Sequence, residues 1–230
     1  MITMKQANSE KDSFINNLFS TDYHAHVLPG CDHGSKDVET SLAQLKMAAQ
    51  AGVRTICATP HFYPQRENID DFLKRRESCY NNLKNNLTAD MPKVLRSAEV
   101  LMCERIDHFE NIEELCLEGT NELLFEMPFY AEWPESLVDS VLNMQCERKD
   151  LTFIMAHADR YSISQVETFI REGIKLQLNI ESLSHTFNSS HLKKWISQGL
   201  VVHIGSDIHQ TDNTYRFWQK GKKVFIRSSK

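Results

Sequence analysis

A recurring unit of helix, glycine and short apolar strand constrains the fold of this chain most. Apolar residues fall at helical spacing over 37–51, Gly52 follows, and an apolar strand is predicted over 53–59. The same order of helix, glycine and strand recurs before the predicted strands 174–180 and 200–205. Strands that alternate with helices are typical of parallel sheets with helical crossovers.

Further elements extend this pattern to about seven β/α units. The other predicted strands span 19–24, 94–101, 122–126 and 151–156. The other predicted helices lie near 68–87, 106–118, 135–148 and 163–172. Since no linker rich in proline, glycine or serine divides the chain, the sequence predicts one barrel-like α/β domain over 1–230. Residues 1–19 are expected to be an N-terminal extension, and 212–230 a short basic tail. Its basic end from Lys220 to Lys230 is expected to be solvated, with docking on an acidic partner as the alternative.

Composition excludes several classes of protein. The chain has 230 residues, of which 41% are hydrophobic and 25% charged, as in an ordinary globular protein. It contains no apolar run long enough to span a bilayer and no signal-peptide core, so we expect a cytoplasmic protein without a transmembrane segment. The net charge of −5 and the pI of about 6.1 argue against nucleic acid as a partner.

The six cysteines do not predict cysteine chemistry. No two of them have the spacing of a metal clip or a redox pair, so we expect them to be reduced and mostly packed as small hydrophobic residues. None is followed six residues later by arginine, the spacing of the phosphate-binding loop in cysteine-based phosphatases. Cys31 nevertheless lies beside a cluster of histidines.

Histidines and carboxylates gather where the predicted strands end. If His24 and His26 end a strand, both side chains point to the same side, because strand side chains alternate. Parallel β/α barrels carry their chemistry at these carboxyl ends. The other candidates at strand ends are His33, His61, Glu99, Glu126, His157, Asp207 and His209. Only the sixth strand, 174–180, ends without an obvious ligand.

Nitrogen and oxygen ligands without cysteine favour Mn²⁺, Zn²⁺ or Fe²⁺ over a structural zinc site. Taken singly, Glu99 or Glu126 could be a hydrogen-bonded carboxylate at the edge of the core, and His157 could be structural. The joint placement of nine such residues indicates a metal centre instead, and nine ligands suit two or three ions.

These motifs together resemble the polymerase-and-histidinol-phosphatase (PHP) family of metal-dependent phosphoesterases. More narrowly, they resemble the bacterial manganese-dependent protein tyrosine phosphatases of capsule and exopolysaccharide systems. The resemblance extends from Asp22 to His209. It rests on His24-Ala-His26-Val-Leu-Pro-Gly, Ala58-Thr-Pro-His61, Ala98-Glu99, the glutamate-proline segment at Glu126, Ala156-His157-Ala-Asp-Arg160-Tyr161 and Ser206-Asp207-Ile-His209.

The resemblance implies a distorted (β/α)₇ TIM-like barrel of the PHP type with three Mn²⁺ ions, Zn²⁺ and Fe²⁺ being the alternatives. It implies three sets of ligands: His24, His26, Glu99 and Asp207 for the first ion, Glu99 as a bridge with Glu126 and His157 for the second, and His33, His61 and His209 for the third. Arg160 would bind the substrate phosphate and act in catalysis with Asp207 and Glu99, and Tyr161 would also contact the substrate. The implied partner is a phosphotyrosine protein, a bacterial tyrosine kinase.

The chain departs from the family pattern at two places. His33 stands where the tyrosine phosphatases usually carry aspartate, which makes the adjacent Asp32 a second candidate ligand. Only 210–230 follow His209, whereas the family usually ends in a longer helical tail, so the closing side of the barrel is expected to be covered differently.

The implied reaction is hydrolysis of a phosphomonoester by metal-activated hydroxide, with Arg160 and the ions neutralising the phosphoryl oxygens. A tyrosine leaving group has a pKa of about 10 and needs little help from a general acid. Three alternatives stay open: a small-molecule phosphatase of the histidinol phosphate type, a nuclease, which the acidic balance disfavours, and a non-catalytic metal-stabilised interaction module. The aromatic residues near the site could line a phosphotyrosine slot or merely pack: Phe62, Tyr63, Phe129, Tyr130, Trp133 and Tyr161.

Overall fold

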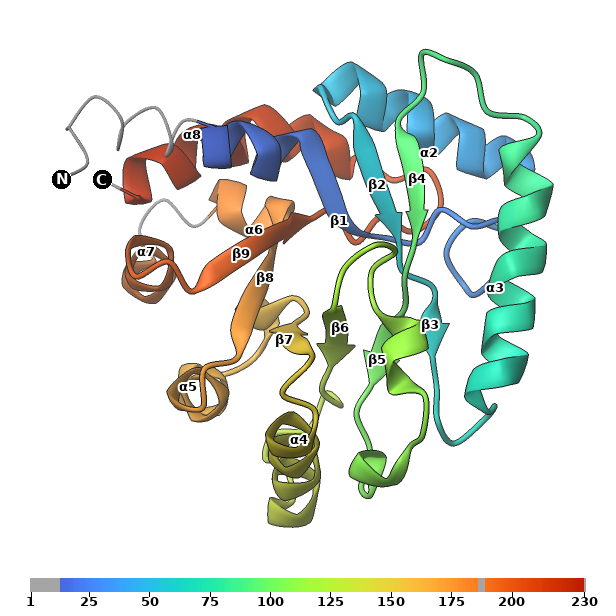
Figure 1. The fold of residues 1–230 in the computed structure, drawn as a ribbon. Helices are drawn as coiled ribbons and strands as arrows, with labels where there is room; N and C mark the ends of the chain where they lie inside the picture. Colours follow the sequence, from blue (N-terminus) through green and yellow to red (C-terminus); the bar gives the residue numbers. More distant parts are fainter. Residues whose placement is uncertain (1–12, 186–188, 230) are drawn as a thin grey trace, which may run out of the picture.

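The computed structural model describes residues 13–185 and 189–229, so 1–12 of the predicted extension lie outside the described residues. The chain folds into α/β units whose strands pair in parallel (Figure 1). One sheet has the order β1 (Thr21–Ala25), β2 (Thr55–Ala58), β4 (Lys93–Arg96). The other has the order β3 (His61–Phe62), β5 (Glu99–Leu101), β6 (Glu122–Glu126), β7 (Thr152–Met155), β8 (Lys175–Asn179), β9 (Val201–Gly205).

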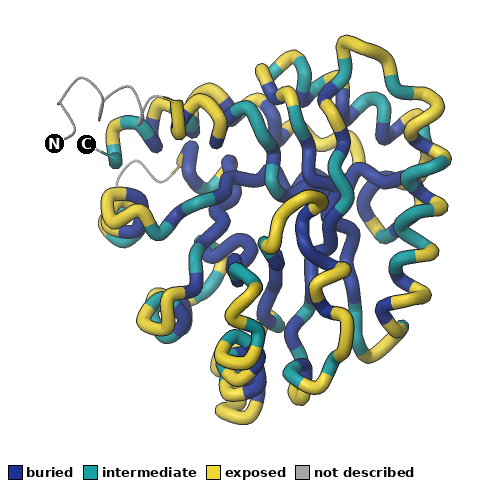
Figure 2. The backbone as a smooth tube through the Cα atoms, viewed as in Figure 1, coloured by how far each residue is buried: buried dark blue, intermediate teal, exposed yellow. Residues whose placement is uncertain are grey.

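Helices lie around the strands, and Figure 2 shows buried strands inside and exposed helical turns outside. Besides a helical segment at 13–20, the described part of the chain has the α-helices α2 (Val38–Ala51), α3 (Ile69–Lys84), α4 (Glu135–Glu147), α5 (Ile163–Arg171), α6 (Ile180–His185), α7 (Ser190–Ser197) and α8 (Trp218–Ser228). Within the described part of the chain, no helix is both long and apolar enough to cross a membrane.

Local sequence explains the boundaries of the predicted helix–glycine–strand units. The Asp37 side chain accepts a hydrogen bond from Thr40 N and caps α2, and Gly52 ends the helix in the left-handed conformation at φ 95°. At the start of α5, Ser162 and Gln165 form a reciprocal capping box. The prediction of parallel strands separated by helices is confirmed.

The strands of the two sheets do not pair into one closed sheet among the described residues. The predicted strand 94–101 is wrong as a single element, because it divides into β4 and β5. Glu99 N bonds to Pro60 O at 3.2 Å, so the chain changes partner at this break. On the other side, an isolated bridge between Ala25 and Ile208 links the end of β1 to the segment after β9.

The helix predicted over 106–118 is also wrong. Two short 3₁₀ helices occupy this region, η1 (Ile106–His108) and η2 (Ile112–Leu115). Arg105 and Asn111 precede them with left-handed backbone, at φ 64° and 60°, which an α-helix does not tolerate. The buried Ile112 and Leu115 gave the apolar spacing that suggested one helix.

The expectation of a solvated end at 220–230 is wrong for its apolar side. After η4 (Thr214–Phe217), α8 buries Trp218 and Phe225, which are 0% and 2% exposed. Both rings contact Phe19 at the end of a helical segment at 13–20, with ring centroids 6.2 and 5.5 Å apart. The apolar side of α8 therefore covers this edge of the fold beside the N-terminal segment (Figure 1). Its basic residues Lys220, Lys223 and Arg227 are exposed.

Candidate metal centre

Glu99 lies at the centre of a histidine cluster at the carboxyl ends of the strands. Its oxygen Oε2 lies 3.1 Å from His24 Nε2 and 3.3 Å from His26 Nε2. The same oxygen is 3.0 Å from His61 Nδ1, and Oε1 is 2.9 Å from His157 Nε2. One buried carboxylate thus joins imidazoles from β1, β3 and the end of β7, the arrangement that a bridging ligand requires.

Two further carboxylates face the same cluster. Asp207 Oδ1 lies 3.5 Å from His24 Nε2 and 3.4 Å from His26 Nε2. Glu126, at the end of β6, places Oε2 3.6 Å from His157 Nε2. The predicted carboxylates Asp207 and Glu126 therefore lie next to the predicted histidines.

Three overlapping groups of these side chains could each hold a metal ion. In each group, the potential ligand atoms lie within 4.8 Å of one another. The groups are His24, His26 and Glu99; His61, Glu99 and Glu126; and His26, His61 and His209. Because the groups share members, ions held by them would be close neighbours, as in a multinuclear centre.

Several buried atoms at the centre have close neighbours but none in hydrogen-bond geometry among the described residues, even where Glu99 Oε2 and His61 Nδ1 lie 3.0 Å apart. They are Glu99 Oε2, His61 Nδ1 and His209 Nε2. Leaving a buried polar atom unpaired costs about 1–3 kcal/mol, so such atoms are uncommon in folded proteins. Converging nitrogen and oxygen atoms of this kind fit a divalent cation such as Mn²⁺, Zn²⁺ or Fe²⁺.

The protonation of the centre follows from its burial and its mixed charges. Burial would raise the pKa of Glu99, but the imidazoles of His24 and His157 lower it well below its usual range. Burial opposes charge on His157 as well, yet hydrogen bonds with Glu126 and Glu99 raise its pKa to about 9. Burial and the neighbouring His26 lower the pKa of His209 to about 4. A cation that binds here would therefore meet ionised carboxylates and would displace the proton from His157.

Two glycines allow the candidate ligands to pack closely. A Cβ at Gly34 would lie 2.3 Å from His26 Cβ, and a Cβ at Gly205 would lie 2.4 Å from His24 Cβ. Side chains essentially never tolerate such contacts, so the close approach of the backbone to His26 and His24 requires glycine at both positions.

Asp32 and Gln177 orient His24, which lies on β1, and His26, which directly follows it. Asp32 Oδ2 accepts a hydrogen bond from His26 Nδ1 at 2.7 Å, which leaves Nε2 for the centre. Asp32 is thus a positioning residue in this structure. Gln177 Oε1 lies 3.1 Å from His24 Nδ1 and accepts a hydrogen bond from His157 N at 2.6 Å.

The sixth predicted strand supplies no candidate ligand, but its Gln177 and Asn179 hold candidate ligands in place. Both lie on β8, and Asn179 Nδ2 donates to Asp207 Oδ2 at 3.2 Å. Their alternation in Gln177-Leu178-Asn179 was the available signal, since it places two buried amides on one face of the strand.

Asp22 is a third buried polar residue near the centre to which the sequence motifs assign no role. Its carboxylate accepts hydrogen bonds from Ser206 N at 2.8 Å and from the hydroxyl of Tyr215 at 2.6 Å. Burial raises the pKa of Asp22 despite these bonds. Asp22 therefore ties β1 to the segment that carries Asp207.

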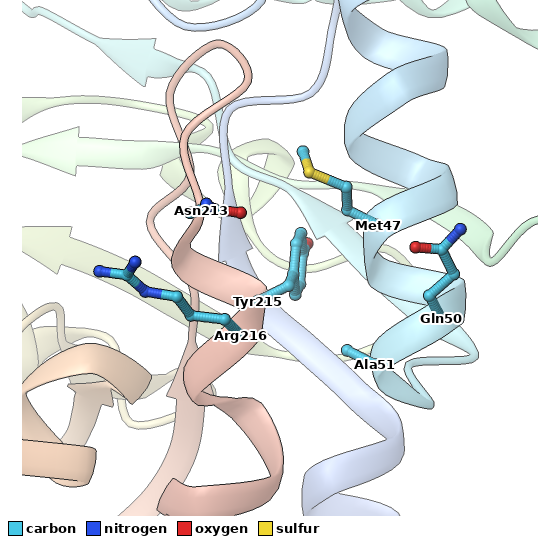
Figure 3. Close-up of a pocket in the computed structure, with 6 residues that line it drawn as sticks. All are labelled: Met47, Gln50, Ala51, Asn213, Tyr215 and Arg216. Atoms are coloured by element: carbon cyan, nitrogen blue, oxygen red, sulfur yellow. The ribbon is translucent and has the colours of Figure 1, made fainter.

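Tyr215 also borders a cavity of about 280 Å³ between α2 and η4 (Figure 3). The lining comprises Met47, Gln50, Ala51, Asn213, Tyr215 and Arg216. No histidine or carboxylate lines this cavity, so it offers no ligand to the metal centre.

Arg160, the predicted phosphate-binding residue, reaches the centre from η3 (Ala158–Arg160) after β7. Its guanidinium nitrogen NH2 lies 2.5 Å from Asp207 Oδ2, while the side chain is 42% exposed. Arg160 thus has one end on a candidate ligand and access to solvent.

The ring of Tyr161 lies near His157, with centroids 5.7 Å apart, and its hydroxyl is already hydrogen-bonded. The hydroxyl donates to Met127 O at 2.7 Å and accepts from Met127 N at 3.0 Å. Phe129 stacks on the Tyr161 ring with centroids 5.4 Å apart, yet it is 63% exposed. Any contact of Tyr161 with a substrate must therefore come from its ring.

His33 lies at the rim of the centre. It is exposed, and its ring lies 4.8 Å from that of His61 and 4.6 Å from that of His209. It belongs to none of the three groups whose ligand atoms converge in the described residues. Its predicted role as a ligand of a third ion stays a prediction.

Known proteins resemble this chain over most of its length. A family model described as capsular polysaccharide synthesis, CpsB/CapC, matches residues 20–224. The tyrosine-protein phosphatase YwqE of Bacillus subtilis is 26% identical over 82% of this chain and 76% of its own length. The tyrosine-protein phosphatase CpsB of Streptococcus agalactiae is 23% identical over 90% of this chain and 89% of its own.

A solved structure shares the fold. It is described as YwqE from Bacillus subtilis and CpsB from Streptococcus pneumoniae, metal-dependent tyrosine phosphatases. It superposes with a TM-score of 0.72 at 21% identity, over 90% of this chain and 86% of that chain.

Proposed function

The chain belongs to the CpsB/CapC family of capsular polysaccharide synthesis proteins, and we propose that it is a metal-dependent protein tyrosine phosphatase. The observation that carries this proposal is Glu99, a buried carboxylate surrounded by imidazoles of three different segments. A bridging carboxylate of this kind suits a centre of two or three ions that acts on a phosphate.

We assign the ligands as the family resemblance implies them, with Mn²⁺ as the ion. The assignment is His24, His26, Glu99 and Asp207 for the first ion, Glu99, Glu126 and His157 for the second, and His33, His61 and His209 for the third. The short distances of Glu99 and Asp207 support the first set, and the contact of Glu126 with His157 supports the second. Bound ions would supply positive charge at the phosphate and lower the pKa of water, so that it can act as a nucleophile near neutral pH.

The protein groups then bind and orient the substrate. Arg160, already beside Asp207, would donate charge-assisted hydrogen bonds to phosphoryl oxygens and hold the developing charge. Gln177 and Asp32 hold the Nδ1 atoms of His24 and His26, so that the Nε2 atoms of both rings face the centre.

The aromatic residues beside the centre favour phosphotyrosine over an aliphatic phosphate. Phe129 stacks on Tyr161 and lies with its ring centroid 5.9 Å from that of His157, yet most of its surface is exposed. An exposed phenylalanine next to the candidate ligands is a suitable platform for the phenol ring of a substrate. Because the family takes part in capsular polysaccharide synthesis, we propose a tyrosine kinase of such a system as the phosphorylated protein.

We also propose that the two sheets are parts of one distorted (β/α)₇ barrel. The bridge between Ala25 and Ile208 and the bond from Asp207 N to His24 O, at 2.7 Å, support continuity between β1 and β9. An experimental structure with β1 and β9 separated would contradict this barrel.

One assay tests the function. The purified chain is stripped with a chelator, reloaded with Mn²⁺, Zn²⁺ or Fe²⁺, and assayed with a phosphotyrosine peptide, its phosphoserine counterpart and histidinol phosphate in one buffer. We expect metal-dependent turnover of phosphotyrosine above both alternatives, and its loss in Glu99→Gln. Preferred turnover of histidinol phosphate would assign a small-molecule phosphatase, and metal binding without turnover of any substrate would assign a non-catalytic module.

A further inference from the structure

A cavity of about 470 Å³ lies beside the metal centre on the side of His61. Its walls include His33 and His61, together with Tyr63 and Arg66 from the loop that follows β3. Arg160 lines a different cavity, which borders Asp207 and His209. The histidine cluster is therefore flanked by two cavities, each with an arginine.

Arg66 is the uncompensated cation of the His61 cavity. Of the two acidic side chains that line it, Glu67 is paired with Arg75, whose Nε lies 3.2 Å from Glu67 Oε2. The other, Asp32, is held by His26 and by backbone N–H groups. The guanidinium of Arg66 has no carboxylate partner in the described part of the chain, which covers 13–185 and 189–229.

The position of this guanidinium is nevertheless defined. Its Cζ lies 4.7 Å from the centroid of the Tyr63 ring, and Arg66 N donates to Tyr63 O at 2.8 Å. Tyr63 in turn stacks on His61, with centroids 5.1 Å apart and an interplanar angle of 15°. A cation–π contact and a tight turn thus hold the charge beside the centre, which reduces the entropy lost when an anion binds.

We propose that Arg66, supported by Tyr63, forms a second anion subsite that binds a carboxylate or phosphate on the same peptide as the phosphotyrosine. This inference rests on the proposed phosphatase function and deepens it. A planar guanidinium binds both carboxylate and phosphate through paired hydrogen bonds, so the shared chemistry is an anionic side chain near the reacting tyrosine. The subsite selects acidic or multiply phosphorylated peptides, although the whole protein has a net charge of −5.

The test compares three peptides that differ at one position at a time. The first carries one phosphotyrosine among neutral residues, the second adds a glutamate, and the third adds a second phosphotyrosine, with the added anion moved stepwise along both sides. We expect the wild-type protein to prefer the anionic peptides by about tenfold in kcat/KM, the value of one charge-assisted contact. If the wild type prefers both anionic peptides, the subsite accepts carboxylate as well as phosphate. If it prefers only the third peptide, the subsite accepts phosphate alone.

Variants of Arg66 test whether the preference for anionic peptides depends on this side chain. In Arg66→Gln the ratio between anionic and neutral peptide should fall to near one, and Arg66→Lys should keep part of it. Arg66→Glu should reverse the preference towards a peptide with lysine at the same position. Arg54→Gln is the matched control, because Arg54 is exposed and precedes β2 at the opposite end of the strands. An equal ratio in wild type and Arg66→Gln, or no preference in the wild type, would overturn the subsite.

A binding measurement tests the subsite independently of the proposed hydrolysis. Fluorescence anisotropy with peptides that carry a non-hydrolysable phosphonate in place of phosphotyrosine measures the same ratio as Kd values. If no phosphotyrosine peptide is hydrolysed, the proposed function fails. The ratio of the Kd values for neutral and anionic peptide, compared between wild type and Arg66→Gln, still decides whether the subsite exists. Because Arg66 is exposed, the ratio should also decrease as salt is added.

Discussion

Replacing Asp32 by asparagine should weaken metal binding at His26, although Asp32 contacts no ion in the proposed assignment. Both oxygens of its carboxylate are acceptors. Oδ2 accepts from His26 Nδ1 at 2.7 Å and from His61 N at 3.0 Å, and Oδ1 accepts from Gly34 N at 2.9 Å. Burial would raise the pKa of Asp32, but the hydrogen bond and charge of His26 lower it well below its usual range, so the group is ionised at neutral pH.

Asparagine replaces one of the two acceptor oxygens by an NH₂ donor group, so it cannot accept hydrogen bonds from all three donors. If its oxygen takes the place of Oδ2, its NH₂ group faces the N–H of Gly34. If its oxygen takes the place of Oδ1, its NH₂ group faces His26 Nδ1 and the N–H of His61. That orientation favours the His26 tautomer with its proton on Nε2, the nitrogen that points to Glu99 and Asp207.

Loss of such a supporting carboxylate typically lowers metal affinity or activity about 10- to 100-fold, or about 1.4 to 2.8 kcal/mol. Titration of metal-free protein with Mn²⁺ in competition with a chromogenic chelator measures the affinity and the number of ions. Asp139→Asn, on the exposed face of α4, is the matched control and should bind as the wild type does. Wild-type affinity for every ion in Asp32→Asn would refute the reasoning.

Four further predictions use the same protein. Arg160→Ala should lower kcat by about 2–4 kcal/mol of transition-state stabilisation at near-normal metal content, and an unchanged kcat would remove this residue from the phosphate site. Phe129→Ala should raise KM for phosphotyrosine peptides severalfold without changing the bound metal, and KM equal to that of the wild type would argue against the aromatic platform. His33→Ala should deplete one ion of three by metal analysis, whereas full occupancy would exclude it as a ligand. Despite its burial, His157 has carboxylate neighbours that raise its pKa from 6.5 to about 9. The protonated imidazole therefore stabilises the folded, metal-free protein fully below about pH 6.5, and this contribution to the free energy of unfolding is lost as the pH rises through 9. A melting temperature that increases from about pH 6.5 to about pH 9 in the presence of chelator would contradict this.

The candidate ligands were predictable because strand ends and donor chemistry can both be read from sequence. The alternation of His24 and His26 placed two imidazoles on one side of β1, and their distances of 3.1 and 3.3 Å to Glu99 agree with that placement. Parallel pairing then brings the ends of distant strands together, which explains why residues as far apart as Glu99 and Asp207 meet at His24.

Other features depended on contacts that local patterns do not encode. The basic residues of 220–230 suggested a solvated tail, yet Trp218 and Phe225 are buried against Phe19, about 200 residues earlier in the chain. Gln177 was missed because an uncharged amide within an apolar strand carries no metal-binding signal of its own. Its function becomes visible only when His24 and His157 are seen to share its side-chain oxygen.

The backbone at two candidate ligands suggests how the centre is organised before any ion binds. His157 and Asp207 both have left-handed backbone, at φ 33° and 52°, which costs about 1–3 kcal/mol for a residue that is not glycine. Each strained residue is held by a short hydrogen bond from its own N–H, His157 to Gln177 Oε1 at 2.6 Å and Asp207 to His24 O at 2.7 Å. The strain is therefore maintained by β8 and β1 themselves, so the rigid strands fix the direction of both side chains. A centre built in this way loses little conformational entropy on binding its ions, because the fold has already ordered the ligands.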